Sequence, residues 1–217
     1  MIAIGDIHGC YKTLIALLER LEQDILNYEQ LIFLGDYIDR GPRSFQVLKK
    51  MVEIRNEDNI VLQGNHEEFY QLFNESKYNI ASSSITACWK KNGGDATIRS
   101  FEENRVPINQ FQEFIGSLPL YYETSKYIFV HAGINKTIEN SSDNDLLWER
   151  TCINHTSKLV IHGHTPISID EIQSQNSPSR QEINIDNGCY LKGMPGYGRL
   201  VAYRPEDDTL WFQENID

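Results

Sequence analysis

The sequence has little basic charge, few cysteines and no long apolar run. Its 217 residues include 31 acidic and only 20 basic side chains, which gives a formal net charge of −11. Nucleic-acid binding relies on neutralising phosphates with lysine and arginine, so this balance argues against a nucleic-acid partner. No apolar stretch approaches the length of a membrane-spanning helix, so we expect no membrane partner either.

The cysteines are far apart and form no CxxC pair; they are Cys10, Cys88, Cys152 and Cys189. A zinc ribbon is therefore not expected, and a reduced, cytoplasmic setting is favoured. Met1 leads directly into Ile-Ala-Ile-Gly-Asp, without the basic and apolar segments of a secretory signal, which supports the same expectation. Length and an ordinary 40% hydrophobic content predict one domain over residues 1–217.

The first seventy residues repeat one pattern: a short apolar run, a motif of Gly, Asp, Asn or His, and then a helical stripe. The apolar runs are Met1–Ile4, Leu31–Leu34 and Asn59–Leu62. Strands that alternate with helices predict a parallel arrangement with helical crossovers, and hence an α/β fold. The motifs that follow would then meet at the carboxyl ends of the strands, where α/β proteins keep their chemistry.

The rest of the chain adds two more strand-and-motif pairs. Tyr127–Val130 leads into His131-Ala-Gly133, and Lys158–Ile161 leads into His162-Gly-His-Thr165. Residues 74–120 predict helices and loops over one edge of the site, with an apolar stripe near Phe111–Leu118.

The last third shows strand patterns at Glu182–Asp186, Gly198–Tyr203 and Thr209–Phe212, separated from the earlier strands by an exposed loop predicted at Gln173–Gln181. We interpret these strands as a second, mainly antiparallel sheet packed on the first.

Six side chains of types that bind metals stand at or near the ends of these strands: Asp6, His8, Asp36, Asn65, His131 and His164. Oxygen and imidazole donors without thiolates suit manganese, iron or zinc. Asp36 would be shared by two ions. Asp6 and His8 would complete the ligands of one ion, and Asn65, His131 and His164 those of the other. Two ions roughly 3.5–4 Å apart can bind one water between them, lower its pKa and aim it for in-line attack.

Three residues remain for the substrate: Arg40, Arg150 and His66. Arg40 and Arg150 are candidate clamps for phosphate oxygens, and Asn65 is expected to face the substrate as well. His66 follows Asn65, so we predict that it protonates the leaving group as a general acid. Asp39 is its natural partner, because a neighbouring carboxylate favours the protonated imidazole.

Ordinary structural roles are the alternatives for several of these residues. Asp39-Arg40 taken alone is typical of a helix cap with a solvated charge, and Asn65 alone of a turn. Arg150 is equally well read as a structural arginine at a helix end. Further interpretations are solvated or capping roles for Glu67 and Glu68, burial for Cys10 and Cys189, and a surface, core or ligand-supporting role for His162.

Together the motifs resemble, in order, the signature of the phosphoprotein phosphatase family of calcineurin-like metallophosphoesterases. They are Gly5-Asp-Ile-His-Gly9, Gly35-Asp-Tyr-Ile-Asp-Arg-Gly41, Gly64-Asn-His-Glu67, His131-Ala-Gly133 and Gly163-His-Thr165. The resemblance covers nearly the whole chain and is greatest to small bacterial and phage members. Support comes from Gly9-Cys-Tyr11, Trp89-Lys-Lys-Asn-Gly-Gly94, Trp148-Glu-Arg150 and Ile185-Asp-Asn-Gly188.

The resemblance implies two mixed β-sheets packed as a sandwich between helices. It implies two divalent ions, often manganese, on the ligands given above, and direct hydrolysis without a phosphoenzyme. It also implies the His66–Asp39 acid pair and phosphate contacts from Arg40 and Arg150. Phosphoserine and phosphothreonine proteins or peptides are the expected substrates and partners, with phosphotyrosine left open.

A related branch of the family hydrolyses diadenosine tetraphosphate symmetrically and is the alternative. It shares several of these motifs but typically lacks the aspartate of Asp-Arg-Gly and has Gly-Asn-His-Asp and Gly-His-Trp. Asp39, Glu67 and Thr165 therefore favour a protein phosphatase. A third hypothesis, a non-catalytic docking protein, would predict lost ligands, and the sequence retains all of them.

Overall fold

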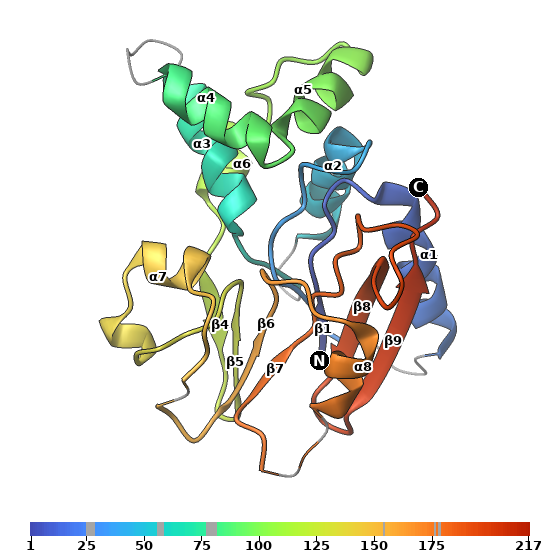
Figure 1. Cartoon of the computed structure of the whole chain (residues 1–217), viewed down its shortest axis with the longest axis vertical. Helices are drawn as coiled ribbons and strands as arrows, with labels where there is room; N and C mark the ends of the chain where they lie inside the picture. Colours follow the sequence, from blue (N-terminus) through green and yellow to red (C-terminus); the bar gives the residue numbers. More distant parts are fainter. Residues whose placement is uncertain (25–28, 56–58, 77–81, 154, 176, 178) are drawn as a thin grey trace.

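The computed structural model describes residues 1–24, 29–55, 59–76, 82–153, 155–175, 177 and 179–217 (Figure 1). The strands are β1 (Ile2–Ile4), β2 (Leu31–Phe33), β3 (Ile60–Val61), β4 (Tyr121–Glu123), β5 (Tyr127–Val130), β6 (Leu159–His162), β7 (Glu182–Asn184), β8 (Arg199–Arg204) and β9 (Thr209–Glu214). The helices are α1 (Tyr11–Asp24), α2 (Ser44–Ile54), α3 (Asn65–Ser76), α4 (Ser82–Lys91), α5 (Gly94–Glu103), α6 (Gln112–Gly116), α7 (Asp143–Trp148) and α8 (Ile169–Ser174), with a 3₁₀ turn at Ile138–Asn140.

The strands form two mixed sheets. The first has the order β3-β2-β1-β8-β9 and the second the order β4-β5-β6-β7. β1, β2 and β3 are parallel, with Ile2 opposite Leu31 and Ile32 opposite Ile60. This confirms the parallel strands and helical crossovers predicted for the first seventy residues.

The grouping of the C-terminal strands differs from the prediction. β8 pairs antiparallel with β1, placing Ala202 opposite Ile4, so β8 and β9 extend the first sheet. β7 instead lies parallel to β6 in the second sheet, which is mainly parallel rather than antiparallel. Alternating apolar residues mark a strand but do not say which sheet edge it joins. The prediction also missed β4, α7 and α8.

Side-chain alternation along the strands separates three cores. Ile2 and Ile4 of β1 face α1 and α2, whereas Ala3 faces the second sheet. In β5, Phe129 points into the space between the sheets, and Val130 points to the outer face, towards α7. Each inner face is buried against the other sheet, because successive side chains of a strand point to opposite sides. The α/β sandwich fold is thereby confirmed.

A group of helices, α3 to α6, stands beyond the carboxyl ends of the strands (Figure 1). It corresponds to the region predicted as helices and loops over one edge of the site, of which residues 77–81 lie outside the described residues. Trp89 of α4 is fully buried here, with its ring centroid 4.7 Å from that of Phe73. None of the helices in the described part of the chain is long and apolar enough to cross a membrane.

Candidate metal centre

The predicted metal ligands come together at the carboxyl ends of five strands. β1 leads to Asp6 and His8, β2 to Asp36, and β5 to His131. Asn65 is the first residue of α3, and His164 follows β6. All six side chains are buried, with at most 8% of their surface exposed. Loops that leave parallel strands at one edge of a sheet are what bring them together.

The backbone at this edge is strained. In the described part of the chain, seven residues other than glycine have a positive φ, and five of these belong to the predicted site. They are His8, Asp36, Asp39, Arg40 and His164, with φ between 47° and 72°. Such conformations cost of order 1–3 kcal/mol each and persist where the surrounding structure enforces them, often at functional sites.

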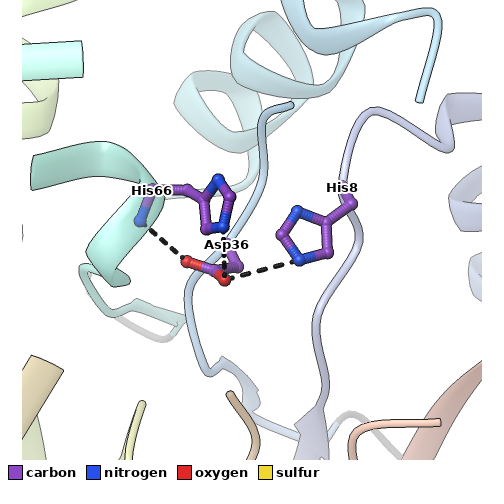
Figure 2. Close-up of side chains that lie close together, drawn as sticks. All are labelled: His8, Asp36 and His66. Atoms are coloured by element: carbon purple, nitrogen blue, oxygen red, sulfur yellow. Dashed lines mark hydrogen bonds and ion pairs between the residues drawn. The ribbon is translucent and has the colours of Figure 1, made fainter. Parts of the chain in front are cut away.

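Asp36 lies at the middle of the cluster (Figure 2). Its Oδ2 is 3.4 Å from Nε2 of His8, and its Oδ1 is 3.4 Å from Nε2 of His131. The backbone N–H of His66 donates to Oδ1 at 3.1 Å. Burial opposes ionisation of Asp36, but the surrounding imidazoles, His131 foremost, hold its pKa well below the usual value. Asp36 is therefore an anion whose two oxygens face the Nε2 atoms of His8 and His131.

A second group of donors converges on the other side of Asp36. The Nε2 atom of His131 lies 2.9 Å from Oδ1 of Asn65 and 3.2 Å from Nδ1 of His164. The same Asn65 oxygen is 3.0 Å from Nδ1 of His164. The metal group predicted around Asn65 is thus assembled in space, although its three residues are far apart in the chain.

Backbone carbonyls fix the orientation of two of these histidines. Nδ1 of His8 donates to the carbonyl of Ile38 at 2.8 Å, and Nδ1 of His131 donates to that of Leu34 at 3.0 Å. Because a carbonyl only accepts, Nδ1 carries the proton and Nε2 keeps a lone pair for a metal. Burial, followed by Arg40 at His8, lowers the pKa of both rings, which keeps them in the neutral, ligating form.

Asp6 completes the group by packing against Gly163. A Cβ atom at Gly163 would lie 2.2 Å from Oδ1 of Asp6, so only glycine permits this approach. The N–H of His164 donates to Oδ2 of Asp6 at 3.2 Å. Burial, and next the charge of Asp186, raise the pKa of Asp6.

Asp186 is a site residue that the sequence reasoning missed. It is 1% exposed, and its Oδ2 has no hydrogen-bond partner among the described residues. Burial raises its pKa to about 7, with a further contribution from Asp36. Its signal was the Ile185-Asp-Asn-Gly188 motif, which we used only as a family marker. It adds a third buried carboxylate beside Asp6 and Asp36.

This donor set fits two divalent cations. Three buried carboxylates stand beside neutral imidazole lone pairs, an arrangement that positive charge would stabilise. Two groups each place their ligand atoms within 4.8 Å of one another: His8, Asp36 and His66, and Asp36, His131 and His164. Cations held there would neutralise phosphoryl oxygens and make a water nucleophilic near neutral pH. The division of the ligands between two ions stays a prediction.

His66 and Asp39 form the expected pair. Nδ1 of His66 lies 2.6 Å from Oδ2 of Asp39, and both side chains are buried. Trp89 donates to the same oxygen at 2.8 Å, and Thr97 donates to Oδ1 at 2.6 Å. Burial favours the neutral ring of His66, but Asp36 and Asp39 outweigh it and raise the pKa. The ring is therefore suited to carry a proton for a leaving group.

Of the two predicted arginine clamps, Arg40 lies closer to the centre. Its guanidinium donates to Nε2 of His8 at 2.6 Å and stacks 4.3 Å above the ring centroid of Tyr190. Arg150 is exposed and follows α7. It lies close enough to His164 to contribute, after burial and His131, to the low pKa of that ring.

Solvated or capping roles were expected for Glu67 and Glu68, and the structure shows that Glu67 caps the start of α3 but is not solvated. Glu67 is fully buried and accepts N–H groups of Asp36 at 2.8 Å, Tyr37 at 2.9 Å and Gly64 at 3.0 Å. Glu68 accepts from Nε1 of Trp148 at 2.6 Å. The first turn of α3 faces the loop after β2, so a position that looks solvent-facing in sequence becomes a support for the site.

The model of the calcineurin-like phosphoesterase family matches residues 1–205, so the chain belongs to this family and is a metallophosphoesterase. An asymmetrical bis(5'-nucleosyl)-tetraphosphatase of Anoxybacillus flavithermus is 28% identical over 95% of this chain and 91% of its own length.

Two solved structures show the same fold. A candidate diadenosine tetraphosphatase has a TM-score of 0.61 and 19% identity over 97% of this chain and 91% of its own. A protein serine/threonine phosphatase of Saccharomyces cerevisiae has a TM-score of 0.62 and 15% identity over 100% of this chain and 80% of its own.

Proposed function

We propose that this chain hydrolyses bis(5'-nucleosyl)-tetraphosphates asymmetrically. One water would add across a P–O–P bond, so that a nucleoside triphosphate and a nucleoside monophosphate leave. The nearly full-length likeness to an enzyme named for this reaction supports the proposal over a protein phosphatase. The same likeness favours asymmetrical cleavage over the symmetrical cleavage that the sequence motifs left as the alternative. The proposed cofactors are two divalent ions, with manganese favoured over iron or zinc.

The observation in the structure that carries this proposal is a cavity beside Arg40. It has a volume of about 310 Å³ and is lined by Arg40, Pro42, Ala96, Arg99, Ser100 and Glu103. That volume is at the lower end of the range for small-molecule sites, roughly 300–1,000 Å³. Arg40 also contacts the metal ligand His8, so it stands between the centre and the cavity. A phosphate chain held at the centre would therefore meet a second cation, Arg99, on the far side of Arg40.

A protein phosphatase for phosphoserine and phosphothreonine is the second candidate, because the Asp39–His66 pair is intact. A serine or threonine alkoxide is a poor leaving group and needs a proton in the transition state. A nucleotide leaves as a stabilised phosphate anion and needs that proton less. The proposed ligands of the metal centre, and Arg40 and Arg150 as phosphate contacts, serve either substrate.

Product analysis separates these functions. Metal-stripped protein reloaded with manganese would be given diadenosine tetraphosphate or phosphoserine, phosphothreonine and phosphotyrosine peptides. We expect equal amounts of ATP and AMP from the dinucleotide, at a kcat/KM well above that for any peptide. Two ADP per substrate would mean symmetrical cleavage, and efficient phosphate release from peptides alone would overturn the proposal.

The cavity can be tested separately with Arg99→Ala. Loss of a charged contact of about 1.5–3 kcal/mol should raise KM for the dinucleotide roughly tenfold or more. Turnover of p-nitrophenyl phosphate, which has no polyphosphate chain, should not change. Arg20→Ala on the exposed face of α1 is the control. An unchanged KM in Arg99→Ala would remove the cavity from substrate binding.

A further inference from the structure

A second cluster of metal-binding side chains lies outside the catalytic centre. It consists of Cys152 in the segment after α7, His162 at the end of β6 and Glu182 at the start of β7. Their ligand atoms, one thiol sulfur, one imidazole nitrogen and one carboxylate oxygen, all lie within 4.8 Å of one another. Nε2 of His162 is 3.3 Å from Oε2 of Glu182.

We propose that Cys152, His162 and Glu182 bind a third divalent cation, zinc by the chemistry of the donors. Thiolate, imidazole and carboxylate are all zinc ligands, and three protein ligands leave a fourth tetrahedral position for water. Ligand atoms about 2.0–2.3 Å from one zinc ion lie roughly 3.3–3.8 Å apart, so only small side-chain movements are needed. The cluster is accessible, because the Glu182 side chain is 43% exposed.

Sheet geometry places this cluster on the outer face of the second sheet. Glu182 pairs with Val160, and His162 lies two residues further along β6, so these three side chains share one face. Val160 belongs to the core on the outer face of the second sheet, and Cys152 packs against the same core. The inner face, which carries Ile161 and Ile183, packs against the first sheet. The proposed ion would thus lie under the segment that follows α7.

A hydrogen-bonded trio without metal is the simpler explanation of the cluster. Burial, followed by a hydrogen bond with Glu182, raises the pKa of the Cys152 thiol to about 12. The metal-free thiol is therefore protonated and linked to Glu182. Zinc would take the sulfur as a thiolate and release that proton to solvent, so its affinity should increase with pH. A hydrogen-bonded trio that is not a metal site would show no pH-dependent affinity for zinc, so an experiment can distinguish the two explanations.

Zinc at this position would also fix the backbone near Arg150, which precedes Cys152 by two residues. The segment is already tied to the residues after β5: Ile153 donates to the carbonyl of Ile134 at 2.7 Å, and Gly133 donates to that of Glu149 at 3.0 Å. A bond from Cys152 to an ion shared with β6 and β7 would add a link to the sheet. The position of a candidate phosphate contact would then depend on zinc.

The test uses cobalt as a spectroscopic substitute for zinc. Metal-stripped full-length protein would be titrated with Co²⁺ and followed in the near ultraviolet, where thiolate-to-cobalt charge transfer absorbs. None of the ligands proposed for the catalytic centre is a cysteine, so this band reports on the new site alone. We expect the band in the parent and in the exposed control Cys88→Ser, and its loss in Cys152→Ser.

Zinc stoichiometry provides a second measurement. The parent and Cys88→Ser should retain three equivalents per chain after gel filtration, and Cys152→Ser and Glu182→Gln two. Circular dichroism would confirm that the variants are folded. A parent without the cobalt band, or with a band that survives Cys152→Ser, would overturn the proposal. Neither measurement uses turnover, so the outcome is independent of the proposed hydrolase activity.

Discussion

Oδ2 of Asp39 lies 2.6 Å from Nδ1 of His66, and Nε2 of the same ring is 3.8 Å from Oδ2 of Asp36. The imidazole thus stands between two buried carboxylates, one of which lies at the middle of the proposed metal ligands. Trp89 and Thr97 hold the outer carboxylate in place from α4 and α5. The helices beyond the strands therefore build part of the reaction centre in addition to covering it.

This arrangement predicts that His66→Asn lowers kcat most for the substrates whose leaving groups are the strongest bases. A general acid contributes about 10²–10⁴-fold, so phosphoserine peptides should lose that much in kcat. Diadenosine tetraphosphate and p-nitrophenyl phosphate, whose leaving groups are weaker bases, should lose less. Steady-state kinetics with all three substrates would measure the difference.

Asp39→Asn should produce the same pattern with a smaller loss, because the ring stays in place but has lost the carboxylate that favours its protonated form. His155→Asn, at an exposed histidine, is the control and should leave every rate unchanged. Equal losses on all substrates at normal metal content would instead mean that His66 positions the substrate and does not donate a proton.

Metal removal should abolish activity, and Asp36→Asn should reproduce the effect. The amide that replaces the Asp36 carboxylate is neutral and a weaker ligand, so we expect divalent affinity to fall at least about a hundredfold. Atomic absorption after gel filtration would show fewer than two retained ions at the catalytic centre. Asp170→Asn on α8 is exposed and should keep the parent's metal content. Full activity of Asp36→Asn in chelator would exclude metal-dependent hydrolysis.

Local pattern was sufficient to predict that the candidate ligands meet at the carboxyl ends of the strands. Each candidate ligand follows a short apolar strand, and parallel strands carry their following loops to one edge. The structure also places the ring centroid of Tyr190 5.1 Å from that of His8. The roles of the individual ligands stay predictions.

The remainder depends on contacts between distant segments, which no local pattern records. Glu67 was given a solvated or capping role, which is usual for an acidic residue in the first turn of a helix, yet it also binds the loop after β2. Asp186 lies two residues beyond β7 of the second sheet, and it comes near Asp36 because that sheet packs against the first. β8 joined the first sheet because β1 had an open edge, which an alternating pattern does not reveal.

Glu67→Ala should destabilise the protein even without metal. It leaves buried N–H groups of Asp36, Tyr37 and Gly64 without their acceptor, and each unsatisfied group costs about 1–3 kcal/mol, with partial relief from water. We expect a loss of roughly 2–4 kcal/mol in urea unfolding with little change in m-value. Glu68→Ala, which removes one partly buried bond to Trp148, should cost less. Equal losses in the two variants would contradict the role given to Glu67.

The contacts of Glu29 predict that the stability of the protein depends on pH. This residue lies beside the start of β1, at the end opposite the proposed metal ligands. Its carboxylate accepts from Arg204 at 2.9 Å and from the amino group of Met1 at 3.1 Å. Burial opposes its ionisation, but these partners prevail and lower its pKa below the usual 4.5. Above pH 4.5 the carboxylate is ionised in the folded and unfolded states, and its full contribution to stability is present.

As the pH falls through 4.5, the unfolded chain takes up the proton first, so this contribution declines and is lost below the folded-state pKa. Glu29→Gln should therefore unfold about 1 kcal/mol more easily than the parent at pH 7. The difference should narrow steadily below about pH 4.5 in urea titrations of metal-free protein. Glu22→Gln on the exposed side of α1 should track the parent at every pH, since Glu22 is exposed. A difference that stays constant from pH 7 to pH 3 would show that the loss comes from packing and not from the charge of Glu29.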